Sequence, residues 1–156
     1  MLMKIQSARQ EDLPLLTRIM VTSFRTAFRY FVSPETLEKN TVEANCLSLL
    51  ESVYQDSSMH FLTDGCNGML VWQDQGQQAE IIALHTLPES HGTGLGRALL
   101  STALGQIGDR PVYLWAFAEN TRARRFYEKN GFSWEGSSRV SEFDEAEEVL
   151  YTNAPA

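Results

Sequence analysis

The sequence predicts an α/β fold with six to seven strands and about four helices. Three observations lead to this prediction. Short apolar segments bounded by turn residues indicate strands, and longer stretches with apolar residues every three to four positions indicate amphipathic helices. A glycine-rich turn at residues 91–96 joins an expected strand directly to an expected helix. A length of 156 residues suits one domain, which we expect to span residues 1–156.

The first half of the chain predicts one short strand, two helices and a hairpin. The strand lies near residues 4–7, and helical spacing follows at Leu13, Leu16, Met20, Phe24 and Ala27. Ser33 and Pro34 form a strong helix start, and the pattern continues to about Tyr54. Residues 59–63 and 69–73 read as two strands joined by the turn-rich segment 64–68, so we expect a hairpin.

The second half predicts four more strands and two helices. A strand at 80–87 leads into the glycine turn and its helix, and an aromatic strand follows at 112–117. The next helix has Asn120 as its N-cap and Gly131 just past its end. Its inward face is expected to carry Ala123, Phe126 and Tyr127. Strands at 132–139 and 147–152 complete the order β-α-α-β-β-β-α-β-α-β-β.

The glycine turn has the properties of an anion-binding site. Gly92, Gly94 and Gly96 remove the Cβ atoms that would block a close approach to the backbone. The helix that follows offers N–H groups without intrahelical partners, at the positive end of its dipole. A Walker-type loop is excluded, because Gly96 is followed by Arg97 and Ala98 rather than Lys and Ser or Thr. A dinucleotide fingerprint read from Gly92 is excluded because it needs glycine at position 97.

The spacing that remains, (Gln/Arg)-x-x-Gly-x-(Gly/Ala), resembles the acetyl-CoA pyrophosphate loop of the GCN5-related N-acetyltransferase (GNAT) family. Here it reads His91-Gly-Thr-Gly-Leu-Gly96, with His91 where the family usually has Gln or Arg. The stretch from Val112 to Phe132 resembles the family's second cofactor motif, and the order of elements is that of the family's fold. The resemblance implies a mixed central sheet and acetyl-CoA as cosubstrate, while the two isolated cysteines, Cys46 and Cys66, lead us to expect no metal. It implies that the cofactor meets His85, Thr86, Leu87, His91, Gly92, Thr93, Gly94, Leu95, Gly96, Arg97, Asn120 and Tyr127.

The resemblance also assigns roles to particular residues. Asn120 stands where the family contacts the pantetheine arm, and Tyr127 where a tyrosine lies near the thioester sulfur as a candidate acid. The alternative for Tyr127 is a packed core tyrosine whose hydroxyl bonds a backbone group. A backbone N–H near Thr86 or Leu87 would polarise the thioester carbonyl.

Two residues of one strand are candidates for the general base. A primary amine with a pKa near 10.4 must lose a proton, which costs about 4 kcal/mol at pH 7. Glu80 is the first candidate, acting through water, and stands where some family members carry their catalytic glutamate. His85 is the alternative, because imidazole transfers protons near neutrality. Strict alternation would place the two side chains on opposite faces of the sheet, whereas a bulge would remove that difference.

The charge distribution favours a cationic acceptor. The formal net charge is −7, and residues 40–96 contain no Lys or Arg. A second acidic cluster consists of Glu142, Asp144, Glu145, Glu147 and Glu148. Such surfaces attract amines and repel nucleic acid, although acidic loops also serve only solubility. A weaker resemblance to bacterial spermidine/spermine acetyltransferases rests on residues 22–28, 33–35 and the acidic segment near the end.

We therefore expect an N-acetyltransferase that acts on a small primary amine such as a polyamine, by direct attack in a ternary complex. The alternatives are an acceptor that is a protein N-terminus or lysine, and a non-catalytic acetyl-CoA-binding regulatory module. Without a signal-peptide pattern or an apolar run of about 20 residues, we expect a cytoplasmic protein with no membrane partner. Cys46 and Cys66 are expected to be free thiols. A homodimer is kept open, because dimers are the commonest soluble homo-oligomers.

Overall fold

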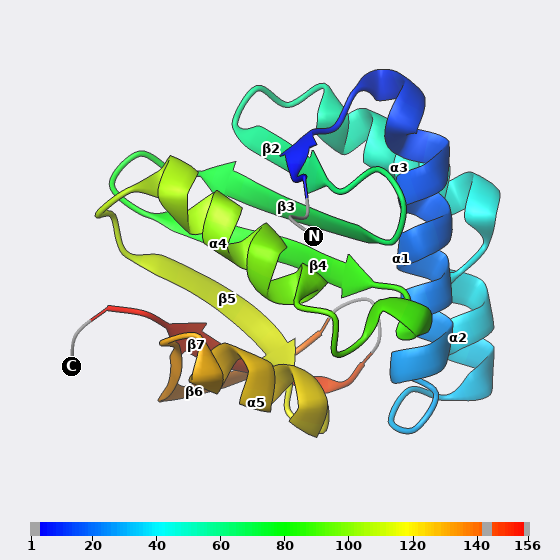
Figure 1. The fold of residues 1–156 in the computed structure, drawn as a ribbon. Helices are drawn as coiled ribbons and strands as arrows, with labels where there is room; N and C mark the ends of the chain where they lie inside the picture. Colours follow the sequence, from blue (N-terminus) through cyan, green and yellow to red (C-terminus); the bar gives the residue numbers. More distant parts are fainter. Residues whose placement is uncertain (1–3, 142–144, 155–156) are drawn as a thin grey trace.

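The computed structural model describes residues 4–141 and 145–154. Seven strands form one mixed sheet in the order β1-β2-β3-β4-β5-β7-β6 (Figure 1). The predicted α/β fold is confirmed, and the order of elements differs from the prediction only in having three α-helices instead of two between β1 and β2. The strands are β1 (Gln6–Ser7), β2 (Met59–Thr63), β3 (Gly68–Asp74), β4 (Ala79–Thr86), β5 (Val112–Phe117), β6 (Ser133–Val140) and β7 (Glu147–Thr152). The α-helices are α1 (Leu13–Ala27), α2 (Pro34–Asn40), α3 (Glu43–Tyr54), α4 (Leu95–Ile107) and α5 (Thr121–Lys129).

The sheet separates two hydrophobic clusters. Helices α4 and α5 cover one face (Figure 1), where Leu99, Leu114 and Tyr151 are fully buried. Helices α1 and α3 cover the β2–β4 part of the other face, with Leu16 and Phe61 in that cluster. Two 3-10 turns, Gln10–Asp12 and Pro88–Ser90, precede α1 and the glycine turn. None of the described helices is long and apolar enough to span a membrane.

One predicted helix is interrupted. The pattern from Ser33 to Tyr54 indicated a single helix, but α2 ends at Asn40 and α3 begins at Glu43. Val42 is extended, with φ −69° and ψ 113°. The guanidinium of Arg25 donates to both the hydroxyl and the carbonyl of buried Thr41, each at 3.1 Å, and these bonds hold the break in place. The described residues therefore contain five α-helices rather than about four.

A bulge in β4 decides which face each of its side chains meets. Val71 pairs with Ala83 but Trp72 pairs with Ile81, so Ile82 is an extra residue. Ala83 consequently packs with the α1 and α3 cluster, whereas Ile81 packs with the α4 cluster. The bulge places Glu80 and His85 on the same face, so the opposite faces expected from strict alternation are wrong.

Strands β4 and β5 separate midway along their length. They run parallel and pair at only three positions, from Ala79 with Val112 to Ile81 with Leu114. Beyond that point no pairing between them is found in the described part of the chain, while β5 continues to pair with β7 as far as Phe117. The split opens toward the end of β4, where the glycine turn begins.

Candidate active site

A cavity of about 700 Å³ lies where β4 and β5 have separated. Its walls come from the end of β4, the glycine turn, the start of α4, the end of α1 and the segment that begins α5. The lining residues are Ser23, Thr26, Ala27, Tyr30, Phe31, Leu84, Thr86, Pro88, Ser90, His91, Gly92, Gly94, Leu95, Gly96, Arg97, Glu119, Asn120, Thr121, Arg122, Ala123, Phe126 and Tyr127.

The glycine turn has a backbone that other residues rarely adopt. Gly92 has φ +81° and Gly94 has φ +90°, and Gly94 is the N-cap of α4. A Cβ atom added at either position would have no atom within 4 Å. The glycines are therefore required by conformation, and the space beside them is open to a ligand. Unpaired N–H groups of the first turn of α4, together with Arg97 and Arg122, suit a phosphate group.

Two residues of the turn have structural roles. A Cβ at Gly96 would lie 3.3 Å from the ring of Phe126, so its absence lets α4 approach α5 closely. Thr93 does not line the cavity. Both its N–H and its hydroxyl donate to the carbonyl of Ser90, and these bonds close the turn.

His91 lines the cavity, and partial burial together with the charge of Arg122 lowers its pKa.

Helix α5 begins and ends as the sequence predicts. The side-chain oxygen of Asn120 accepts the N–H of Ala123 at 3.2 Å, and Gly131 follows the helix with φ +91°. The side-chain NH₂ of Asn120, which lines the cavity, has no partner within the described residues. It is thus available to a carbonyl oxygen of a ligand.

Tyr127 combines burial with an unused hydroxyl. Only 8% of the residue is exposed, and its ring packs edge-on against Phe126 and Phe132. Burial raises the pKa of Tyr127. Within the described residues its hydroxyl makes no hydrogen bond, although the residue lines the cavity. The structure therefore does not show the alternative expected for Tyr127, in which its hydroxyl bonds a backbone group.

The end of β4 presents the backbone N–H of Thr86 toward the gap beside β5. The N–H of Leu87 donates to the carbonyl of Asn67 at 2.8 Å, on the β3 side. Because N–H groups alternate between the two edges of a strand, that of Thr86 points toward the gap beside β5. Leu87 packs instead with the α1 and α3 cluster. The two candidates for carbonyl polarisation thus reduce to Thr86, and Leu87 is wrong for that role because its N–H is already bonded.

Glu80 lies away from the cavity. It belongs to the part of β4 that is still paired with β5, and its carboxylate accepts hydrogen bonds from Tyr113 at 3.1 Å and Gln75 at 3.3 Å. Burial raises the pKa of Glu80, although these bonds oppose the effect. The structure does not bring this predicted base together with Tyr127.

His85 lies behind the cavity wall and contacts one residue that lines it. Its Nδ1 is 3.1 Å from Oγ of Ser23 in α1, and the ring of Phe24 packs at 4.9 Å. Burial lowers the pKa of His85 to about 4, so the imidazole is neutral at pH 7. Sequence reasoning missed Ser23. The available signal was spacing, because Ser23 lies three residues after Met20 and four before Ala27, on the face of α1 that turns inward.

The end of α1 forms an aromatic wall beside this pair. Phe31 and Tyr30 line the cavity, and Phe28 and Phe31 both pack against Phe117 at the end of β5, with ring centroids 4.7 and 5.2 Å away. These contacts anchor the chain after α1 over the split between β4 and β5.

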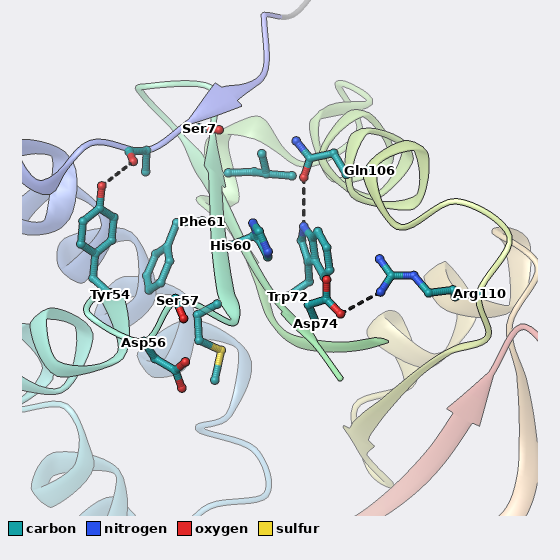
Figure 2. Close-up of a pocket in the computed structure, with 13 residues that line it drawn as sticks. Ser7, Tyr54, Asp56, Ser57, His60, Phe61, Trp72, Asp74, Gln106 and Arg110 are labelled. Atoms are coloured by element: carbon teal, nitrogen blue, oxygen red, sulfur yellow. Dashed lines mark hydrogen bonds and ion pairs between the residues drawn. The ribbon is translucent and has the colours of Figure 1, made fainter. Parts of the chain in front are cut away.

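A second hollow, of about 520 Å³, lies elsewhere, against β2 and β3 (Figure 2). Its wall contains Trp72, on which the ring of His60 stacks at 4.1 Å. The indole N–H of Trp72 donates to Gln106, and Arg110 pairs with Asp74 at 2.7 Å. Because these polar groups bond one another, we place the active site in the larger cavity.

The sequence resembles those of known acetyltransferases. The sequence profile of the Acetyltransferase (GNAT) family matches residues 28–132. An uncharacterized N-acetyltransferase of Mycobacterium bovis is 30% identical over 135 residues, which is 81% of this chain and 86% of the relative.

Solved structures show the same fold. The PaiA N-acetyltransferase of Thermoplasma acidophilum, in complex with coenzyme A, has a TM-score of 0.78 at 20% identity and covers 99% of this chain and 100% of its own. A chimera of the spermidine N-acetyltransferase SpeG from Vibrio cholerae and hSSAT has a TM-score of 0.69 at 19% identity. The match covers 96% of this chain and 93% of the chimera. With its profile match over residues 28–132 and a relative at 30% identity, the chain belongs to the GNAT family of acetyl-CoA-dependent N-acetyltransferases.

Proposed function

We propose that this enzyme transfers the acetyl group of acetyl-CoA to a primary amine of a small cationic acceptor, with polyamines as the leading class. The unpartnered hydroxyl of Tyr127, nearly buried in the cavity between the glycine turn and α5, carries the proposal. A group in this position can hydrogen-bond only to a ligand or to solvent. It suits a proton donor to a departing thiolate.

Each part of acetyl-CoA has residues that fit it. The N–H groups at the start of α4, with Arg97 and Arg122, suit the pyrophosphate, and the amide of Asn120 suits the pantetheine arm. The cosubstrate supplies an activated thioester. Thr86 then donates its N–H to the thioester oxygen, and Tyr127 donates its proton to the sulfur. The raised pKa of Tyr127 keeps that proton in place until the C–S bond breaks.

Charge supports a cationic acceptor. Residues 40–96 carry seven acidic residues and no Lys or Arg. Two carboxylates, Glu80 and Glu148, lie on the sheet face that also carries His85 and Phe117. Glu148 pairs with Arg139 at 3.0 Å, whereas Glu80 lies outside the cavity, is hydrogen-bonded to Tyr113 and forms no ion pair among the described residues. Of the second acidic cluster, Glu142 and Asp144 lie outside the described residues.

The acceptor class can be tested by release of free thiol from acetyl-CoA against polyamines, amino sugars, amino acids and short peptides. We expect turnover with spermidine or spermine, since an acidic surface attracts polycations and should give a rate that falls as salt increases. Turnover confined to peptides would contradict the small-amine proposal and favour protein acetylation. Tight acetyl-CoA binding without any turnover would favour a regulatory module.

The acid role can be tested with Tyr127→Phe, which keeps the ring and removes the hydroxyl. We expect kcat to fall about 100-fold or more, as for loss of a general acid, while the Kd for acetyl-CoA changes little. Tyr54→Phe is the control, because it removes a hydroxyl that bonds the carbonyl of Ala8 far from the cavity. An unchanged kcat would remove Tyr127 from this role.

The phosphate site can be tested with a pair of matched glycine variants of α4 and its cap. Gly94→Ala places a methyl group in open space but at φ +90°, where an L-residue is strained by about 1–2 kcal/mol. Gly105→Ala adds the same methyl group in open space within the helix, without a positive φ. We expect calorimetry to show weaker acetyl-CoA binding, by about tenfold, for Gly94→Ala alone. Equal affinity in both variants would contradict the assignment of the turn.

A further inference from the structure

The Ser23 hydroxyl bonds a side chain of the sheet rather than a carbonyl of its own helix. Thr17 and Thr26 of α1 donate to the carbonyls four residues earlier, at 2.8 and 2.9 Å, as hydroxyl groups in helices often do. Ser23 makes no such bond within the described residues and meets Nδ1 of His85 at 3.1 Å instead. Since Ser23 lines the cavity and His85 does not, the serine is the outer member of the pair.

The surroundings of His85 leave its Nδ1 able to accept. Its only hydrogen-bond partner within the described residues is Ser23, and Phe24 packs against the ring. Burial lowers the pKa of His85 and no charged group contributes to the shift, so the resting imidazole is neutral. When Nε2 holds the single ring proton, Ser23 donates to Nδ1, and the lone pairs of its Oγ remain to accept a hydrogen bond from the cavity.

From this geometry we propose that Ser23 and His85 form the proton relay that serves as general base, with Ser23 as the catalytic residue that meets the acceptor nitrogen. This inference rests on the acetyl transfer proposed above and assigns the base of that same site. His85 acts through Ser23, so it is a positioning and proton-holding residue. Glu80, already bonded to Tyr113 and Gln75 outside the cavity, is not needed in this scheme.

Each proton transfer and each bond formed or broken in the proposed reaction can be followed in order. The ammonium proton of the acceptor leaves to solvent first, so that the neutral amine attacks the thioester. As the bond from nitrogen to the acetyl carbon forms, the remaining amine N–H becomes acidic and passes its proton to Oγ of Ser23. The hydroxyl proton of Ser23 moves at the same time to Nδ1 of His85, which holds it only transiently because burial disfavours the charged imidazole. The C–S bond breaks, and the sulfur takes the proton of Tyr127. The proton on His85 then returns to the tyrosinate through solvent, which restores the resting state.

The test is a double-mutant cycle with Ser23→Ala and His85→Asn, assayed with the best amine that the wild-type enzyme turns over. The Asn amide can accept a hydrogen bond near the place of Nδ1 but cannot take up a proton. Each single variant should lower kcat about 100-fold, as expected for loss of a general base, with the KM for acetyl-CoA within twofold. The double variant should be no slower than either single variant, because both residues serve one relay. Thr22→Ala, which removes an exposed hydroxyl on the same helix, should behave as wild type.

Three results would overturn the relay. These are a kcat of Ser23→Ala within twofold of wild type, losses that multiply in the double variant, or a loss confined to Glu80→Gln. Ser23→Ala removes one oxygen from a partly exposed position, so it tests the relay even where His85→Asn fails to fold. An error in the acceptor class appears as a different best amine in the panel. Such an error does not change the comparison between variants, so failure of the relay and failure of the proposed function are distinguishable.

Discussion

The separation of β4 from β5 is the constraint on which the rest of the site depends. The two strands share three paired positions and then diverge, so backbone groups on the β5 side of β4 lose their strand partner. Buried backbone groups need hydrogen-bond partners, and a ligand or solvent must supply them here. The N–H of Thr86, a residue that lines the cavity, is one such group. The split therefore creates a space for an extended ligand. It also leaves backbone groups that such a ligand can hydrogen-bond.

The starts of α4 and α5 supply further polar groups beside the separated ends of β4 and β5. Helix α4 starts at a glycine with positive φ beside the end of β4, and α5 starts at Asn120 beside the end of β5. Close packing at Gly96 and Phe126 brings these two starts to one cavity. On the opposite side, the end of α1 is held by Phe28 and Phe31 against Phe117. The ends of β4 and β5, the starts of α4 and α5, and the end of α1 thus meet around the position expected for the thioester.

Local features of the site were predictable from the sequence, whereas its through-space pairs were not. The N-cap at Asn120 and the glycine turn follow from local backbone chemistry; the structure confirms the cap and shows positive φ at Gly92 and Gly94. The bulge at Ile82 depends on pairing with β3, so alternation gave the wrong faces for Glu80 and His85. The break at Thr41 depends on Arg25, sixteen residues away. Ser23 was missed for the same reason, because its partner lies 62 residues along the chain.

The central claim is that acetyl-CoA occupies the cavity between the glycine turn and α5. The most direct test is a titration of the isotope-labelled protein with acetyl-CoA, followed by backbone amide NMR. We expect the largest shift changes at the amides of Thr86, Gly94, Gly96 and Asn120, with little change at His60 and Trp72 around the second hollow (Figure 2). Changes centred on His60 and Trp72, with the glycine turn unaffected, would contradict this claim.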